Sequence, residues 1–580
     1  MAERQFQVLA VDLATGGHER LAFGGRTELL GGSGLAAGLH AAFGHPELPA
    51  EDPAQPLIFA IGPLTGYFPL MSKVVCGFRS PYHNQYAESH AGGRLALALR
   101  FAGLDALVLR GAAATPSCLV VGGERCSLLD VHYLWGMDAL ETGKRLRTIV
   151  PEAAGHRSIL RIGPAGEAGG AYACINVDTF RHFGRLGAGG VMGRKRLKAI
   201  VVLGDRSAPT PPGKSYASLF QTLYGRLTET DVMNKYHDLG TPRNLIPLND
   251  QRALPWRNLQ QTNDAAVTAI SGERFADELL LRNSACAGCP IGCIHIGLLR
   301  EQFADRHHYL YRQVSYDYEP IFAAGTMLGL TRPSDVLRLL ETIERAGLDA
   351  MSTGVALAWA TEALARGVIA ETETLLPLRF GEADAYDRAI DYLASGRNAF
   401  YERLREGTGT AVAAYGGGEF ACLLGQEMAG YATGEVFFTS QAYGFRHSHL
   451  DAAGYSFDQT ATGRDVDAAV DFLLADERER VLLTSMVACL FARGAYPRAS
   501  LAAALEAVGD GALASDLEAA AARIQRLRWR ERLATGCDLD AIRIPRRFHE
   551  VTTWKGPLDG AYLDALGRAY RAALRALAAD

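Results

Sequence analysis

The strongest constraint on the fold is a run of three cysteines near the middle of the chain. Cys286, Cys289 and Cys293 follow the spacing C-x2-C-x3-C, and the glycines between them let the backbone turn tightly. Soft thiolate ligands at this spacing favour an iron–sulfur cluster or a zinc ion. A cubane cluster takes four cysteines, so the fold must bring a fourth from a distant segment. A zinc site, which His295 could complete, more often shows two close pairs or a mixed Cys/His set.

Length and charge narrow the class of protein. A chain of 580 residues should hold several domains, and 48% hydrophobic with 21% charged residues is typical of a globular protein. The net charge of −5 argues against a nucleic-acid partner. The sequence contains no apolar run long enough for a membrane span and no signal segment at its start. Ten mostly scattered cysteines do not form a disulfide framework, so we expect a cytoplasmic location.

The hydrophobic pattern predicts an α+β fold with three domains. Residues 1–208 should form a β-rich domain, because short aliphatic runs bounded by turn residues are typical of strands. The expected strands are 6–12, 57–61, 106–110, 118–121 and 199–203. Beyond a proline-rich linker at 208–213, apolar residues recur at helical spacing, as in 334–346, 384–393 and 501–528. A glycine-rich stretch near 395–420 divides this part into mainly helical domains at 209–410 and 411–580.

Glycine loops recur through the β-rich region. The loop at 185–193 runs into the basic segment 194–198, an arrangement that can bind phosphate through backbone N–H groups and side chains. A tight turn followed by a solvated basic face explains the same pattern. None of the loops has the strand, G-x-G-x-x-G and acidic residue of a dinucleotide-binding fold.

Taken in order, these segments resemble the tungsten-containing aldehyde:ferredoxin oxidoreductases. The resemblance covers more than 500 residues, and it rests on the order and spacing of many short motifs rather than on any single one. These motifs are Gly31 to Gly34, Gly62 to Gly66, Gly163 to Glu167, Gly189 to Gly193 with Lys198 to Ile200, Gly240-Thr241, Leu254 to Asn258, the cysteine run, Asp317-Tyr-Glu319, Gly347 to Asp349 with Ser352 to Gly354, Gly444 to His447, and Arg532 with Thr535-Gly536.

The resemblance implies a metal–pterin cofactor. In this family the dithiolene sulfurs of two pterins hold tungsten, and the same sulfurs could bind molybdenum. The family order makes Cys489 the fourth ligand of a [4Fe–4S] cluster with Cys286, Cys289 and Cys293. The domain at 209–410 then supplies three cluster cysteines, and the domain at 411–580 supplies the fourth.

Several positions match residues that bind the pterin phosphates and their bridging Mg²⁺ in the family. Lys73 stands where the family has arginine, and His90, before Gly92 and Gly93, stands where it has asparagine. Lysine lacks the bidentate fork of arginine, and histidine has no amide oxygen for magnesium. Arg185 and Leu186 match a second phosphate- and magnesium-binding pair.

Two D-x-x-G-L-C/D motifs hold the pterins in the family. The first reads Glu344-Arg-Ala-Gly347-Leu348-Asp349, with glutamate for the leading aspartate. The second, Thr484-Ser-Met-Val-Ala-Cys489, keeps the cysteine but replaces the carboxylate, the glycine and the leucine. The chain is therefore identified as a divergent member, in which one pterin contact is rebuilt or lost.

The family comparison places Glu319 and His447 beside the substrate. A carboxylate in a partly dry pocket can accept a proton from water, and an imidazole can stabilise charge that develops on oxygen. Glu319 could instead be a helix-start carboxylate, and His447 could be a polar core residue. The segment 300–309 is interpreted as an insertion, a loop or hairpin that either lies near the pocket or is a surface excursion.

The resemblance implies an oxidoreductase that converts a small aldehyde to a carboxylic acid and passes electrons through the cluster. The expected partner is a ferredoxin or a ferredoxin-like iron–sulfur subunit, in a homo- or hetero-oligomer. Two alternatives stay open. One is low-potential reduction of an aromatic acyl-CoA, although this chain has no cysteine between Cys293 and Cys422 for the metal. The other is a cluster-bearing electron-transfer or scaffold protein without pterin.

Overall fold

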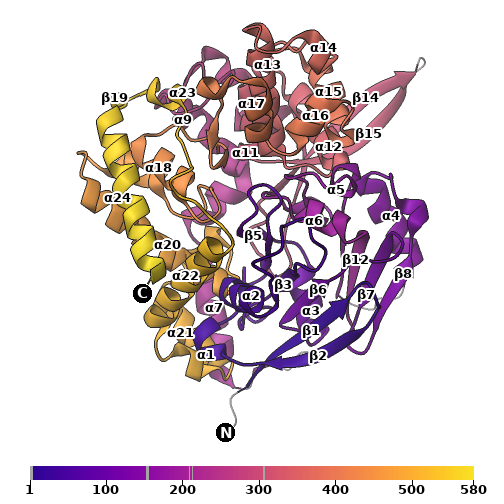
Figure 1. Cartoon of the computed structure of the whole chain (residues 1–580). Helices are drawn as coiled ribbons and strands as arrows, with labels where there is room; N and C mark the ends of the chain where they lie inside the picture. The colour runs from indigo at the N-terminus through magenta and orange to yellow at the C-terminus, as the bar shows by residue number, and fades with distance from the viewer. Residues whose placement is uncertain (1–3, 152–155, 208–209, 212, 305–306, 580) are drawn as a thin grey trace.

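A computed structural model describes residues 4–579 apart from 152–155, 208–209, 212 and 305–306. The first third of the chain forms two β-sheets with short helices, and most of the remainder is helical (Figure 1). This confirms the α+β fold class. The linker at 208–213 falls partly outside the described residues. No helix in the described part of the chain combines the length and the apolar character that a membrane crossing needs.

The two large sheets share one strand order. The first runs β2-β1-β6-β3-β4-β5 and the second β8-β7-β12-β9-β10-β11, with parallel and antiparallel pairs in the same places. The first sheet consists of β1 (Phe6–Asp12), β2 (His18–Phe23), β3 (Leu57–Ala60), β4 (Val74–Arg79), β5 (Tyr86–Ala91) and β6 (Ala106–Arg110). The second consists of β7 (Ser117–Val121), β8 (Cys126–Asp130), β9 (His156–Arg161), β10 (Ile175–Val177), β11 (Arg181–Phe183) and β12 (Leu197–Gly204).

Burial explains why these segments form strands. Every residue of β3, β4, β7 and β12 is buried, as expected for aliphatic runs in the interior of a sheet. The edge strand β2 is mostly exposed and polar. One hydrophobic cluster joins the sheets, with Leu9 and Phe59 from the first and Leu119 and Ile200 from the second. The two sheets also approach each other where β5 lies against β11.

The helical part packs around one large hydrophobic cluster, in which Trp359 and Tyr570 are both buried. Because that cluster extends across residue 410, the boundary there stays a prediction. The helix expected at 501–528 is two helices separated near the glycines at 509 and 511. The main helices are α11 (Tyr318–Ala324), α12 (Pro333–Ala346), α13 (Ala350–Ala365), α15 (Ala383–Ser395), α18 (Glu435–Tyr443), α20 (Val466–Ser485), α21 (Arg498–Ala507), α22 (Leu517–Ala534) and α24 (Gly560–Ala579).

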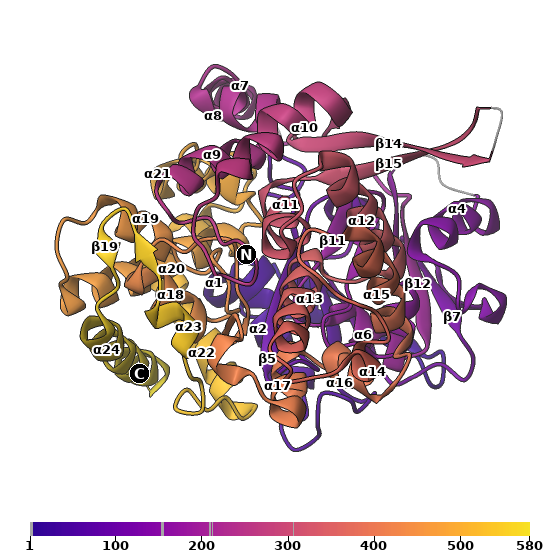
Figure 2. The same ribbon diagram turned by 90° about the horizontal axis from the view of Figure 1, so that it is seen from above.

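A small sheet carries the cysteine run. Strands β13 (Leu280–Ser284), β14 (Ile294–Ala304) and β15 (His308–Tyr316) pair in that order, and the cysteines occupy the loop between β13 and β14. The pair β14–β15 projects from the body of the molecule as a hairpin (Figure 2). None of the described residues between 300 and 309 lines the central cavity, so the segment interpreted as an insertion is a surface excursion.

Candidate active site and cofactor cavity

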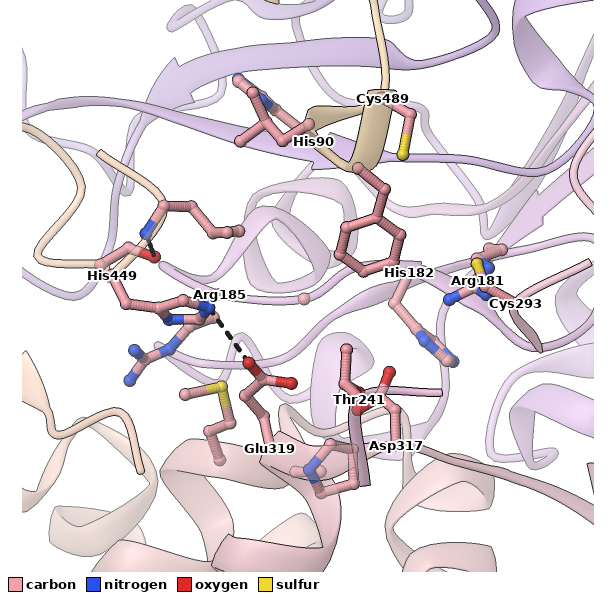
Figure 3. A pocket seen from close by; sticks show the side chains of 18 of the residues that line it. His90, Arg181, His182, Arg185, Thr241, Cys293, Asp317, Glu319, His449 and Cys489 are labelled. Atoms are coloured by element: carbon pink, nitrogen blue, oxygen red, sulfur yellow. Dashed lines mark hydrogen bonds and ion pairs between the residues drawn. The ribbon is translucent and has the colours of Figure 1, made fainter. Parts of the chain in front are cut away.

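A cavity of about 730 Å³ lies between the two β-sheets and the helical part. Its walls come from the ends of β5, β11 and α12, the start of α11, and the segments that follow α18 and α20. Figure 3 shows the side chains that point into it from these elements. Of the residues expected at the site, Gly92, Gly93, Gly347 and His447 are not part of the lining. Those that line the cavity are Lys73, His90, Arg185, Leu186, Cys286, Cys289, Cys293, Glu319, Glu344, Leu348, Asp349 and Cys489.

The four cysteines of the expected cluster all line this cavity. Cys489 lies beyond α20, and its backbone N–H donates to the carbonyl oxygen of Leu70 at 3.0 Å. Gly92 matters for close packing, because a β-carbon there would lie 2.6 Å from Sγ of Cys286. Among the residues that the structure describes, no three Cys, His, Asp or Glu side chains are gathered closely enough to hold one metal ion.

Two half-buried cations face the cysteines. Burial opposes ionisation of the Cys286 thiol, but the positive charges of Arg181 and Lys73 lower its pKa below the ordinary value. In return the cysteines raise the pKa of Lys73 and of Arg181, against the effect of burial. The Nε atom of Arg181 is buried without a hydrogen-bond partner. The site is therefore built to hold negative charge.

His295 does not complete the cysteine site. Its ring is buried, and Nε2 lies 2.7 Å from the carbonyl oxygen of Asp238. Nδ1 faces the carbonyl oxygen of Cys293 at 3.2 Å. Because both ring nitrogens are occupied by backbone carbonyls, His295 has none to offer a metal.

Glu319, at the start of α11, is the centre of a second polar group in the cavity. Its Oε1 accepts a hydrogen bond from Nε2 of His449 at 3.1 Å (Figure 3). The same oxygen accepts a hydrogen bond from the hydroxyl of Tyr431 at 2.9 Å. Burial opposes ionisation, but the contact with His449 outweighs it and lowers the pKa of Glu319. This carboxylate is therefore ionised at neutral pH.

Asp317 lies two residues before this carboxylate and behaves in the opposite way. Burial, and next the negative charge of Glu319, raise the pKa of Asp317 to about 7, although Arg181 opposes the shift. Near neutral pH the cavity thus holds one ionised and one partly protonated carboxyl group close together.

His447 is turned away from the cavity. Nδ1 donates to the carbonyl oxygen of Ala442 at 2.9 Å, and Nε2 accepts from Arg532 at 2.6 Å. Burial, and next the charge of Arg532, hold the pKa of His447 well below its ordinary value. The structure therefore brings His449, rather than His447, to Glu319.

The first candidate pterin motif forms the end of α12, and we call residues 343–349 the first helix end. Glu344 contacts Nε2 of His182 at 2.9 Å, and Asp349 caps the next helix, α13, while pairing with Arg185 at 3.3 Å. Gly347 has φ 74°, and Leu348 forms a single β-bridge with Ala173. The buried Nη1 atom of Arg185 has no hydrogen-bond partner among the described residues.

The second candidate motif forms the end of α20, and we call residues 483–489 the second helix end. Thr484 Oγ1 accepts a hydrogen bond from Ser33 at 2.8 Å, and Ala488 bridges to Met71. Val487 adopts φ 56°, a left-handed conformation that β-branched residues rarely take.

His90 lies in β5, close to this second helix end. Its Nε2 contacts Glu88 at 3.1 Å, and Nδ1 faces Arg446 at 3.2 Å. Burial, and next the charge of Arg446, lower the pKa of His90 to about 4. Glu88 itself is fully buried and is also paired with Arg528 at 2.8 Å. His90 is therefore neutral and fully engaged with protein groups.

Comparison with known sequences decides the family. The model of the aldehyde ferredoxin oxidoreductase N-terminal domain matches residues 8–204, and that of domains 2 and 3 matches residues 218–576. The chain belongs to the aldehyde ferredoxin oxidoreductase family. The resemblance drawn from the sequence is thereby confirmed.

The chain is similar to several known proteins, two in sequence and one in fold. It is 30% identical over 394 residues to the tungsten-containing aldehyde ferredoxin oxidoreductase of Pyrococcus furiosus, covering 67% of this chain and 63% of that protein. It is 27% identical over 370 residues to the aliphatic sulfonate oxidoreductase, WOR-like subunit, of the same organism, covering 61% and 57%. The active site complex BamBC of benzoyl coenzyme A reductase, solved with 1,5 dienoyl-CoA, has a chain of the same fold. That chain is 20% identical, with a TM-score of 0.82 over 98% of this chain and 95% of the other.

The residues of the cavity fit the metal–pterin cofactor of the aldehyde ferredoxin oxidoreductase family. The free Nη1 of Arg185 and the free Nε of Arg181 are buried donors that an anionic cofactor would satisfy. The two sheets of like strand order also provide two similar loops after their third strands, at Gly62-Pro63 and Gly163-Pro164. Each of these loops packs against one helix end.

Four residues of the site lie outside the sequence-based predictions: Arg181, His182, Tyr431 and His449. A signal existed for three of them. Arg181 and His182 precede Arg185 in a basic segment, and His449 follows His447 by two residues. Nothing in the local sequence distinguishes Tyr431 from other buried tyrosines.

Proposed function

We propose that this protein is a tungsten or molybdenum bis-pterin oxidoreductase that converts an aldehyde and water to a carboxylic acid. The observation that carries the proposal is the ionised Glu319, held by Tyr431 and His449 in the same cavity as four cysteines. The family membership supports the cofactor. The substrate and the partner are inferred from the chemistry of the cavity.

The chain's own residues would handle the protons. Oxidation of an aldehyde by water releases two electrons and two protons per molecule of acid formed. The Glu319 carboxylate would accept a proton from the attacking water, because its lowered pKa keeps it ionised at neutral pH. Tyr431 and His449 orient the carboxylate and donate hydrogen bonds to it, and the cofactor, when bound, takes up the two electrons.

Electrons would leave through the cysteine side of the cavity. Cys286, Cys289, Cys293 and Cys489 would hold one [4Fe–4S] cluster, and Lys73 and Arg181 would offset its negative charge. A cluster passes electrons one at a time, so the proposed acceptor is a ferredoxin or a ferredoxin-like subunit. Magnesium between the pterin phosphates remains part of the proposal, but His90 is engaged with Glu88 and Arg446 instead.

The proposal is tested by replacing the proton acceptor. Glu319→Gln keeps the shape of the side chain and removes the base, so kcat should fall about a hundredfold to ten-thousandfold. Iron, metal and pterin content should stay at wild-type levels. The exposed Glu382, changed to Gln, is the control. Turnover above roughly a third of the control would show that Glu319 is not the base.

Two neighbouring histidines provide a second test. His449→Asn should lower kcat by at least about tenfold, since it removes a hydrogen bond to the catalytic carboxylate. His447→Asn should instead lower the melting temperature, because the ring of His447 is hydrogen-bonded to the carbonyl oxygen of Ala442 and to Arg532 inside the protein. If kcat fell in His447→Asn and only the melting temperature fell in His449→Asn, the catalytic role would belong to His447.

A second candidate function is the reduction of an aromatic acyl-CoA, which the likeness to the benzoyl coenzyme A reductase chain favours. Against it, the cysteines that line the cavity are Cys174 and the four of the cluster site, and Sγ of Cys174 contacts the carbonyl oxygen of Leu348 at 3.6 Å. Purified protein should be assayed with benzoyl-CoA and a low-potential dye. Protein that contains iron but no tungsten, molybdenum or pterin would instead support the scaffold alternative.

A further inference from the structure

Three cations gather at the outer end of the cavity. Lys235 and Arg493 are exposed and line the cavity, and the charge of Arg243 lies close enough to Lys235 to lower its pKa. We call Lys235, Arg243 and Arg493 the cationic triad. Its members come from two separate segments. Lys235 and Arg243 lie in the short helices before and after residue 240, and Arg493 lies in the segment that follows the second helix end.

The triad has no carboxylate partner. None of the three forms an ion pair with Asp or Glu among the residues that the structure describes. Burial, and next the positive charges of Arg493 and Arg243, lower the pKa of Lys235. Like charges held together without counter-ions are unfavourable, so the arrangement suits an anion that arrives from solution.

An aromatic wall connects the triad to the proposed base. Tyr236 stacks on Phe491 with ring centroids 4.0 Å apart, beside Lys235 and Arg493. Tyr455, which lies near Tyr236, stacks on Tyr431 at 5.2 Å, and Tyr431 donates to Glu319. All of these aromatic residues line the same cavity.

We propose that the cationic triad binds an oxyanion group of the substrate, so that the enzyme prefers aldehydes that carry a carboxylate, phosphonate or sulfonate at the end remote from the reacting carbon. This inference rests on the proposed function and names its substrate class. A substrate is favoured over an acidic protein partner because two of the three cations line the concave cavity that holds Glu319.

The test compares aldehydes of similar length. Holoenzyme is assayed with butanal, 4-oxobutanoate and the corresponding phosphonate aldehyde, with a viologen dye as acceptor. A single well-placed ion pair is enough for about a tenfold preference in kcat/KM for the anionic aldehydes. The preference should shrink as ionic strength rises, because the triad is exposed.

Variants assign the preference to the triad. In Lys235→Gln/Arg493→Gln the ratio of kcat/KM for 4-oxobutanoate to that for butanal should fall to about one, mainly through KM of the anionic aldehyde. Lys235→Arg should keep the preference, because the charge remains. The control is Lys144→Gln on α4 (Ala139–Ile149), whose side chain is exposed and remote from the cavity.

An equilibrium measurement separates this inference from the proposed function. Calorimetry on wild-type holoenzyme should find succinate bound about tenfold more tightly than butanoate. In the double variant the two acids should bind equally tightly. If that holds while no aldehyde is oxidised, the triad is an anion site and only the aldehyde chemistry fails. If butanal is oxidised but neither anionic aldehyde is preferred over butanal, and succinate binds no more tightly than butanoate, the inference is overturned.

A protein-docking role gives a different pattern. In that case the double variant would reduce a ferredoxin more slowly, while the ratios among the three aldehydes with the dye stay at wild-type values. That result would overturn the substrate assignment and make the triad part of a partner interface.

Discussion

The two helix ends have the same backbone but different side chains. At the first, the N–H of Leu348 donates to the carbonyl oxygen of Ile343 at 3.2 Å, and at the second the N–H of Ala488 donates to that of Leu483 at 2.9 Å. Both are the six-residue closing bond of a helix C-terminus. Each end also forms a single β-bridge with the segment just before a strand. Leu348 pairs with Ala173, before β10, and Ala488 pairs with Met71, before β4. The shared geometry persists although the second end has lost the residues that define the motif.

The residue in the left-handed position marks the difference. At the first helix end it is Gly347, where a β-carbon would lie 2.7 Å from the backbone nitrogen of Gly163. At the second it is Val487, whose side chain is fully buried in a cluster with Ile58 and Val75. The first end is fixed by close backbone packing. The second tolerates backbone strain because its side chain fills the core under a sheet.

The carboxylate has also changed position. At the first helix end the motif itself supplies Glu344, which pairs with His182. At the second, Thr484 is a hydroxyl residue, and the carboxylate–histidine pair next to it is Glu88 with His90, both from β5. The comparison shows that a motif can lose its acid while the neighbouring strand keeps an acid–histidine pair at the same cavity.

The largest difference between the ends should be in iron content. Cys489→Ser at the second end should lower iron from about four atoms per chain to a small fraction, because a cubane needs four soft ligands. Asp349→Asn, at the matching position of the first end, should leave iron unchanged. Iron measured by mass spectrometry decides the matter, and full iron in Cys489→Ser would remove that residue from the ligand set.

The next effect should appear at the first end. Gly347→Ala adds a β-carbon that meets Gly163, in a conformation with φ 74°. We expect a loss of more than about 2 kcal/mol in the free energy of unfolding, together with reduced pterin content. Gly367 has φ 70° with open space around it, so Gly367→Ala should cost only about 1 kcal/mol. Equal costs in denaturant titrations would refute the packing argument.

The acid–histidine pair of the second end predicts a pH dependence. Because the pKa of His90 is about 4 in the folded chain and 6.5 ordinarily, the unfolded chain binds more protons between these values. Stability should therefore fall as pH drops from about 6.5 to 4, by an amount on the order of 2 to 3 kcal/mol from this group. His90→Gln should flatten that part of the stability–pH curve. An unchanged slope would mean that His90 titrates normally.

The smallest effect concerns strain at Val487. Val487→Ala loses buried methyl groups at a cost of about 1 to 2 kcal/mol. Val487→Gly loses more surface but regains about 1 to 2 kcal/mol of left-handed strain. The two variants should therefore be about equally stable in denaturant titrations. A glycine variant that is clearly less stable than the alanine variant would show that the strain is negligible.

Local patterns predict five of the twelve strands in the two large sheets but not the arrangement of the strands. The expected strands 6–12 and 106–110 coincide with β1 and β6, because each is an aliphatic run closed by turn residues. The common order of the two sheets depends on pairings between strands far apart in sequence, which no local pattern carries. The helix expected at 501–528 is broken because Gly509 and Gly511 interrupt its apolar spacing.

The residues that the sequence assigns to the site come together where the assignment depends on residue type, and they separate where it depends on the direction of a side chain. All four cysteines, Glu319 and Arg185 line the cavity. His447 does not, because the turn at this residue, with φ 50°, points its ring at Arg532 and leaves His449 to face Glu319. A sequence motif fixes positions along the chain, whereas the side that a residue presents depends on the turn around it.

The pairing of Glu88 with Arg528 has a consequence for how the protein is made. The two residues are 440 positions apart, so the first sheet leaves the ribosome long before the arginine that neutralises its buried carboxylate. A buried charge without its partner is strongly unfavourable, which keeps the newly made sheet from closing. Within the N-terminal third, Glu88 has only His90, Tyr86 and the hydroxyl of Ser33 as described side-chain partners, so we expect this interior to close fully only after α22 is synthesised. We expect a bulky prosthetic group to enter during that interval, before the last helices pack over the cavity.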